Sequence, residues 1–208
     1  MVEALDYIFH RIIPDRVISP TLDPSLISKN GKFARIAPIA RKQYKSELIT
    51  GRVKKIVIML SGSVFGSPVE ITGENYSFQI DIVGRAAPAE YVTKKYVRYH
   101  NKVKDNSSLL LDADLMIVNG GFSAISEAFC MRKPMVVIPV PKHAEQWVNA
   151  KTVEKLGIGS ISSEQNLEQA MNLAIDRIDE FRAAYRSIGD IGNGADQAAS
   201  EILSMAES

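Results

Sequence analysis

The chain has 208 residues, of which 46% are hydrophobic and 24% are charged, and its formal net charge at pH 7 is +1. Such a composition is typical of a globular protein with a substantial core, and the near-zero charge gives no electrostatic reason to expect nucleic-acid binding. No stretch approaches the roughly 18 to 20 consecutive apolar residues of a transmembrane helix. Cys130, the single cysteine, excludes an intramolecular disulfide and fits a cytoplasmic protein.

The first fifty residues contain too few predicted elements for a domain of their own. The chain opens with a predicted helix whose apolar residues share one face: Leu5, Ile8, Phe9 and Ile12. We expect this face to pack against protein, the alternative being a membrane surface. The run "DRVISP" (15–20) predicts a buried strand that ends at a proline, and "FARIAPIAR" (33–41) predicts a short strand or an extended crossing.

From residue 55 onward, predicted strands alternate with predicted helices. Apolar runs rich in β-branched residues predict strands at 55–60, 78–83, 115–118, 135–140 and 158–161. A long helix is predicted over 165–186, and a short one follows the breaker "GDIGNG" (189–194). Continuous apolar strands separated by helices indicate an α/β fold, a Rossmann-like parallel sheet with helices on both faces.

Three loops follow predicted strands at their carboxyl ends, where open α/β sheets form their ligand crevice. The first loop, "SGSVFGS" (61–67), contains Gly62 and Ser63. It matches neither the dinucleotide fingerprint nor the Walker loop. A plain glycine turn explains this loop as well as a ligand does.

The second loop, "NGGFS" (119–123), leads directly into a predicted helix. Gly120 and Gly121 lack a Cβ, so a ligand could approach the backbone there. The following helix presents unpaired N–H groups and the positive end of its dipole to an anion. Ser123 is expected either to cap the helix or to contact a phosphate. Glu127 lies on the same helix face and suits a ribose diol, but it could equally be a solvated acid of the first turn.

The third loop, "PVPKHAEQW" (139–147), places His143, Glu145 and Gln146 at a helix start. The carboxylate and the amide could bind sugar hydroxyls. The alternative is helix-start capping with Trp147 packed into the core. His143 has no second histidine or cysteine at ligand spacing, so no metal site is predicted.

The segment "DADLMIVNGGFSAISEAFCMRKPMVVIPVPKHAEQWVNAKTVEKLGIG" (112–159) resembles the donor-binding, C-terminal half of a GT-B glycosyltransferase. The most similar group is family 28, which includes the bacterial peptidoglycan N-acetylglucosaminyltransferase and archaeal relatives. The resemblance implies a role for each of the following residues: Phe122, Ser123, Gly120, Gly121, Gly62, Ser63 and Arg41 at the donor diphosphate, Val103 at the base, Glu127 at the ribose, and His143, Glu145 and Gln146 at the sugar. Asn119 departs from the family, which often has His or Ser at that position.

The resemblance also implies a function and an arrangement of domains. Residues 1–50 are interpreted as a remnant of an N-terminal domain with the interdomain linker, and residues 51–208 as the nucleotide-sugar binding domain. The expected reaction is inverting transfer from a UDP-sugar, with UDP-N-acetylglucosamine as the expected donor and with no metal or other cofactor. Cys130 is expected to be a core residue and not a nucleophile, and no general base is identified.

The acceptor and the base would come from a separately encoded N-terminal subunit, which could also bring this chain to a membrane. Self-association of the chain is a further possibility. Two other interpretations stay open. The first is a nucleotide-sugar-binding module without turnover, or a fragment of a split gene. The second, ranked below the first, is a UDP-sugar 2-epimerase.

Overall fold

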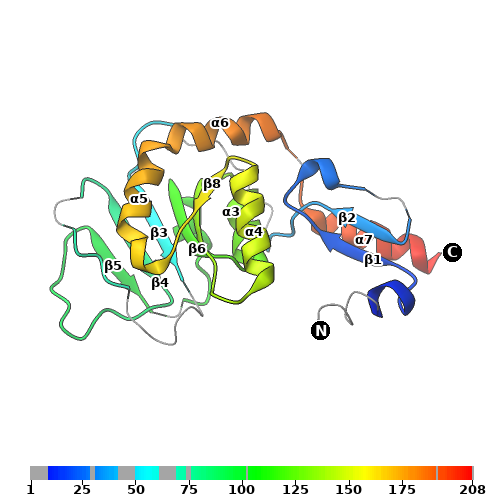
Figure 1. Ribbon diagram of the computed structural model, residues 1–208, viewed down its shortest axis with the longest axis horizontal. Helices are drawn as coiled ribbons and strands as arrows, with labels where there is room; N and C mark the ends of the chain where they lie inside the picture. Colours follow the sequence, from blue (N-terminus) through cyan, green and yellow to red (C-terminus); the bar gives the residue numbers. More distant parts are fainter. Residues whose placement is uncertain are drawn as a thin grey trace.

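A six-stranded parallel sheet forms the centre of the computed structural model (Figure 1). The structure describes residues 9–28, 31–41, 50–60, 69–73, 76–101, 103–190 and 192–207. The strands are β3 (Lys55–Met59), β4 (Gln79–Val83), β5 (Val97–His100), β6 (Leu115–Asn119), β7 (Met135–Ile138) and β8 (Gly159–Ile161). Their spatial order is β5-β4-β3-β6-β7-β8, so the order reverses between β3 and β6. In a sheet of this kind, ligands bind beyond the carboxyl ends of the strands at that reversal.

The predicted parallel sheet is confirmed, although one strand was missed. Ile58 pairs with Ile82 of β4 and with Ile117 of β6, in a register that keeps their apolar side chains in the core. β5 has the sequence VRYH, which contains no apolar run. An edge strand that is buried on only part of its surface does not need one, and therefore it left no hydrophobic signal in the sequence.

Successive side chains of a strand point to opposite faces of the sheet, so a continuously apolar strand makes both faces apolar. Helices cover both of these faces. The helices of this main body are α2 (Ser107–Leu111), α3 (Phe122–Cys130), α4 (Ala144–Lys155), α5 (Leu167–Asp176) and α6 (Ile178–Ile188). Ile56 and Ile58 belong to the core cluster that contains Met171 of α5. Val57, between them in the sequence, belongs to the opposite cluster with Ile125 of α3.

The prediction of one long helix over 165–186 is wrong. A short 3-10 turn, η2 (Glu164–Asn166), precedes α5, and Arg177 separates α5 from α6 with φ −100° and ψ 10°. The apolar spacing continues in phase across this break, so the sequence pattern did not reveal it. Ile178 and Phe181 of α6 still pack in the same core cluster as Met171 of α5, and only the later part of α6, with Tyr185, packs in the other cluster.

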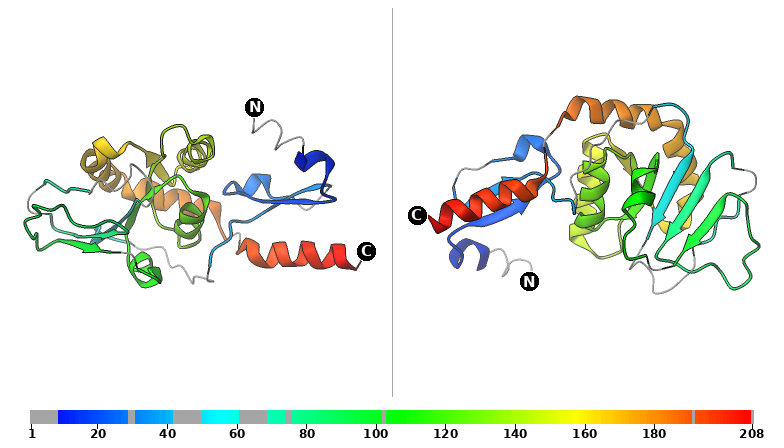
Figure 2. Two further views of the ribbon diagram at one scale, coloured as in Figure 1. Left: turned by 90° about the horizontal axis from the view of Figure 1, so that it is seen from below. Right: turned by 180° about the vertical axis from the view of Figure 1, so that it is seen from behind.

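A small lobe lies beside the main body and contains β1 (Val17–Pro20), η1 (Pro24–Leu26), β2 (Phe33–Ile36) and α7 (Gly194–Ala206). β1 and β2 pair in parallel, and α7 lies alongside them, away from the six-stranded sheet (Figure 2). An ion pair between Arg16 and Glu201 joins the two ends of the sequence. The C-terminal helix therefore packs with the first forty residues, while the division of the chain at residue 50 stays a prediction.

The small lobe is fastened to the main body by the segment after β1. Leu22 is only 2% exposed and packs into the core cluster of α3 and α4. Asp23 accepts a hydrogen bond of 3.0 Å from Lys155 at the end of α4. Hydrogen bonds from Ser25 and then from Lys155 hold the pKa of the Asp23 carboxyl below its ordinary value.

Lys133 gives the main body a predicted pH dependence. It is buried, its ammonium donates to the carbonyl of Leu111 at 2.6 Å, and burial lowers its pKa to about 8 against the attraction of Asp114 and Asp112. The unfolded chain keeps this proton up to its ordinary pKa of 10.5, so the lysine's contribution makes the protein more stable as pH rises from about 8 to 10.5. Lys133→Met should therefore stabilise the protein at pH 7, by on the order of 2 kcal/mol after allowing for the lost hydrogen bond.

Urea unfolding of the variant and the wild type at pH 7 and at pH 10.5 checks this prediction. The stabilisation should be largest at pH 7 and mostly gone at pH 10.5. Lys151→Met, at an exposed lysine on α4, is the control and should change stability little at either pH. The same stability difference at both pH values for Lys133→Met would contradict it.

Candidate functional site

The helix α3 begins directly at the carboxyl end of β6. Gly121 is its N-cap, with φ −63° and ψ 132°, and the carbonyl of Gly121 accepts a hydrogen bond from the amide of Ile125 at 3.2 Å. The amides of the first turn, Phe122 to Ala124, have no acceptor within the helix, so they point with the positive dipole end toward the crevice. The alternative in which Ser123 caps the helix is wrong, because the N-cap is Gly121, two residues earlier, and Ser123 is already the second residue of α3.

The two glycines of the turn have different surroundings. A Cβ on Gly120 would lie 2.6 Å from the Cβ and from the carbonyl oxygen of Gln146. The carbonyl of Gly120 also accepts a hydrogen bond of 3.0 Å from Asn149. The missing side chain of Gly120 therefore makes room for α4, and its predicted role at the diphosphate stays a prediction. A Cβ on Gly121 would meet nothing within 4 Å in the described part of the chain, which leaves space for a ligand.

Glu127 forms the centre of a polar cluster one turn further along α3. Its side chain accepts hydrogen bonds from Nε of Arg41 to Oε1 and, at 2.8 Å, from Nη2 to Oε2. Arg41 also donates to Oδ1 of Asn106 at 3.1 Å, and Asn106 in turn contacts the sulfur of Met59. Glu127 is only 5% exposed. The alternative of a solvated first-turn acid is therefore wrong, because the carboxylate is buried and paired.

A pocket of about 640 Å³ opens in front of this cluster. It is lined by Pro20, Ile39, Arg41, Met59, Phe122, Ser123, Ala124 and Glu127. Its walls thus come from the small lobe, from the linker, from the end of β3 and from the first turns of α3. The pocket brings a helix N-terminus and an arginine–carboxylate pair to the carboxyl edge of the sheet, at the reversal of strand order.

The linker that carries Arg41 is braced by the start of α7. Asn193 accepts from the amide of Ala40 at 3.4 Å and donates to the carbonyl of Ala40 at 3.2 Å. Gln197 accepts from the amide of Ala37 at 2.8 Å, and the amide of Gly194 donates to Pro38 at 2.9 Å. Sequence reasoning treated this segment only as a chain breaker. The Asn-Gly pair before a helix was the available signal, and Asn193 does cap α7 through the amide of Ala195.

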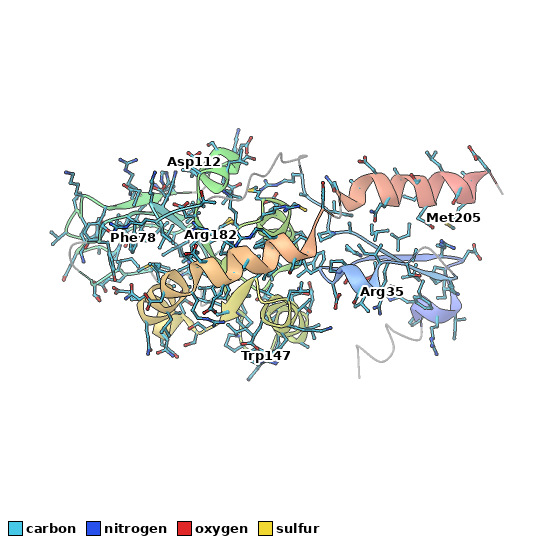
Figure 3. The ribbon with its side chains drawn as sticks, turned by 90° about the horizontal axis from the view of Figure 1, so that it is seen from above. Arg35, Phe78, Asp112, Trp147, Arg182 and Met205 are labelled. Atoms are coloured by element: carbon cyan, nitrogen blue, oxygen red, sulfur yellow. The ribbon has the colours of Figure 1, made fainter. Side chains whose placement is uncertain are left out.

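The third loop leaves most of its polar residues in solvent. His143 is the exposed N-cap of α4 without a side-chain capping bond, and Glu145 is exposed. Gln146 is half-buried, and its Oε1 accepts from the amide of Val140 at 2.9 Å, which holds the loop on the helix. Trp147 is 52% exposed and extends outward from α4 (Figure 3), so the alternative that packs it into the core is wrong.

Comparison with known sequences identifies the family. The profile of the glycosyltransferase family 28 C-terminal domain matches residues 66–201, which is more than half of the chain. The chain belongs to glycosyltransferase family 28. An uncharacterized glycosyltransferase of Methanopyrus kandleri is 32% identical over 92 residues, which cover 44% of this chain and 26% of that protein.

A second relative is the UDP-N-acetylglucosamine–N-acetylmuramyl-(pentapeptide) pyrophosphoryl-undecaprenol N-acetylglucosamine transferase of Geobacillus kaustophilus. It is 31% identical over 107 residues, which cover 50% of this chain and 30% of that protein. The matched part of this family 28 chain thus spans less than a third of either relative.

Solved structures show the same fold. MurG of Acinetobacter baumannii superposes with a TM-score of 0.63 at 14% identity, over 92% of this chain and 61% of that one. CalG4, the calicheamicin glycosyltransferase, gives a TM-score of 0.61 at 18% identity, over 98% and 58% of the respective chains. Both are GT-B glycosyltransferases, so the family 28 chain has the Rossmann-like fold of one half of that architecture.

The structure says less about the other residues predicted for the family 28 site. Val103 is 38% exposed and follows the carboxyl end of β5 in the loop before α2. Gly62 and Ser63 lie outside the described residues. Within the ranges that the structure describes, no group of three or more His, Cys, Asp or Glu side chains could hold a metal ion. Of the helices found in those ranges, none is long and apolar enough to cross a membrane.

Cys130, at the end of α3, has the properties of a structural thiol. Its side chain is half-buried, and burial together with the charge of Glu127 raises its pKa to about 11. A thiol with such a pKa is almost fully protonated at neutral pH and is a poor nucleophile. This agrees with the expectation that Cys130 takes no part in chemistry.

Proposed function

We propose that this chain is the donor-binding part of a glycosyltransferase that uses a UDP-sugar, with UDP-N-acetylglucosamine as the donor. One observation carries the proposal: the first turn of α3 and the buried carboxylate of Glu127 line the same pocket. A helix N-terminus suits a diphosphate, and a carboxylate one turn away suits a ribose diol. The donor named for the Geobacillus relative supports the choice of sugar nucleotide.

In this proposal the nucleotide follows the carboxyl edge of the sheet. The diphosphate lies at the amides of Phe122 to Ala124, where Gly121 leaves space. The ribose hydroxyls donate to Glu127, and the uracil meets the backbone near Val103. The sugar extends toward the start of α4, where His143, Glu145 and Gln146 are available for hydrogen bonds.

The reaction is displacement at the anomeric carbon of the sugar by an acceptor hydroxyl. The bond from the anomeric carbon to the diphosphate oxygen breaks with inversion, and UDP leaves. Negative charge that develops on the leaving oxygen is stabilised by the helix N-terminus and its amides, which are already oriented toward it. The proposal assigns this stabilisation to the protein's own groups and includes no metal ion.

The acceptor hydroxyl and its general base are assigned to an N-terminal half, on the same or on a separate polypeptide. The GT-B relatives support this assignment, because this chain covers only 61% of MurG and 58% of CalG4. A chain with a donor site and no acceptor half would bind nucleotide sugar without turnover.

The role of Glu127 is tested with nucleotides that differ in one ribose hydroxyl. Calorimetric titration should show saturable binding of UDP and UDP-N-acetylglucosamine, and no comparable binding of GDP or ADP. The wild type should prefer UDP over 2′-deoxy-UDP by about 1–3 kcal/mol, the cost of a lost hydrogen bond to a charged group. Glu127→Ala should remove this preference, because its partner for the hydroxyl is gone.

Glu154→Ala, at an exposed acid on α4, is the matched control and should keep the preference for UDP. A Glu127→Ala variant that still discriminates against 2′-deoxy-UDP would remove Glu127 from the ribose site. Absence of binding for every nucleotide would refute the proposal for this chain on its own.

A further inference from the structure

The carboxylate that the proposed function assigns to the ribose already has a strong partner. Glu127 accepts two hydrogen bonds from the guanidinium of Arg41, one to each carboxylate oxygen. Such bidentate pairs are among the strongest hydrogen bonds in proteins. A ribose diol can reach the carboxylate fully only if Arg41 gives up part of this pairing.

The two members of the pair differ in their freedom to move. Glu127 is fixed in the second turn of α3 and is 5% exposed, so its charge needs a partner at all times. The Arg41 side chain is 57% exposed, although it belongs to the same ion pair. Rearrangement therefore falls to Arg41, while Glu127 keeps its place.

The diphosphate of the proposed function would bring a second anionic acceptor for Arg41 into the same pocket. Arg41 lines the pocket together with Phe122, Ser123 and Ala124, whose amides form the proposed diphosphate site. A guanidinium has five donors in a planar fork that fits a phosphate as well as a carboxylate. Moving between the two anions thus requires a change of side-chain conformation within one pocket.

We propose that Arg41 is a specificity-determining residue that exchanges partners: it pairs with Glu127 until a diphosphate binds, and then turns to the diphosphate and leaves Glu127 to the ribose. This inference rests on the proposed function. A nucleoside without phosphates has to compete with Arg41 for the carboxylate. Pyrophosphate without a ribose draws Arg41 away and leaves the buried charge of Glu127 unpaired. The site consequently selects ligands that carry both groups, and rejects each part alone.

The exchange predicts opposite effects on two ligands in one variant. Arg41→Met removes the competitor for Glu127, so uridine should bind about 5- to 10-fold more tightly. The same variant loses a donor to the diphosphate, so UDP should bind about 10-fold more weakly. The ratio of the two dissociation constants, measured by calorimetry, should therefore change by roughly 50- to 100-fold. An arginine that only supports the shape of the site would change both affinities in the same direction.

Glu127→Gln provides an independent measurement with pyrophosphate as the probe. The glutamine keeps the size of the side chain but no longer holds the guanidinium by charge. Arg41 is then available to the anion, and pyrophosphate should bind about 3- to 10-fold more tightly than to the wild type. Arg186→Met, at an exposed arginine of α6, is the control for the loss of one positive charge and should change none of these affinities much.

The outcomes separate this inference from the proposed function. Circular dichroism first shows that each variant is folded, and Arg41→Lys, which keeps the charge without the fork, should lie between the wild type and Arg41→Met. If UDP binds the wild type but Arg41→Met weakens uridine and UDP by the same factor, or changes neither, the exchange is overturned and the proposed function stands. If neither UDP nor uridine binds the wild type, both are overturned.

Discussion

An alanine at position 194 is expected to separate α7 from the linker, at a cost of about 3 kcal/mol in the local free energy of opening. A Cβ on Gly194 would overlap the carbonyl oxygen of Ala37, and backbone cannot give way as the end of a flexible side chain can. Moving the helix away breaks the 2.9 Å hydrogen bond from the amide of Gly194 to Pro38. Overpacking costs about 1–3 kcal/mol or more, and the lost hydrogen bond adds about 1 kcal/mol.

The loss should be local, because Gly194 and Glu201 are the residues that α7 buries. Amide hydrogen exchange should accelerate about 100-fold in α7, as about 3 kcal/mol requires, and stay unchanged in β3 and β6. Ala195→Ser, at the next and exposed position of the same helix, is the control. Equal acceleration in the central strands, or none in α7, would contradict the prediction.

The same substitution connects the C-terminal helix to the pocket. Asn193 holds both backbone groups of Ala40, the residue that precedes Arg41. When α7 moves, this bracing is lost and Arg41 is presented less accurately. On the proposed function, Gly194→Ala should therefore weaken UDP binding as well, even though position 194 does not line the pocket.

The central fold was predictable from sequence because its signals are local. Ile56, Ile58 and Ile117 belong to unbroken apolar runs, and a run buried on both faces reads as a parallel strand wherever it occurs. β5 and the break at Arg177 were not predictable in this way. The first is an edge strand without an apolar run, and at the second the apolar spacing is in phase on both sides.

The candidate site was predictable only in its local part. The strand, the glycine turn and the helix N-terminus are adjacent in sequence, so "NGGFS" alone indicated an anion site. The partner of Glu127 is 86 residues away, and only the resemblance to family 28 pointed to Arg41. That the two side chains pair depends on how the linker crosses α3 and on the bracing by Asn193, which no local pattern encodes.

Gly120 and Gly121 are adjacent at the start of α3, but replacing each by alanine should have a different effect: one substitution should lower stability and the other should lower UDP affinity. Gly120→Ala places a Cβ 2.6 Å from the Gln146 backbone and side chain, so α4 must shift, and we expect a loss of about 3 kcal/mol in the free energy of unfolding. Gly121→Ala keeps an ordinary backbone conformation, with φ −63°, and its Cβ meets open space. Its stability should stay within about 0.5 kcal/mol of the wild type.

Binding should reverse the order of the two variants. The new methyl group of Gly121→Ala occupies the space proposed for the diphosphate, so UDP affinity should fall by roughly tenfold in a protein of normal stability. The main effect of Gly120→Ala should be on stability. The folded fraction of this variant should bind UDP more tightly than Gly121→Ala does. Urea unfolding and calorimetric titration of both variants measure the two effects separately. Should Gly121→Ala bind UDP as the wild type does, the diphosphate does not occupy the open space beside the Cα of Gly121.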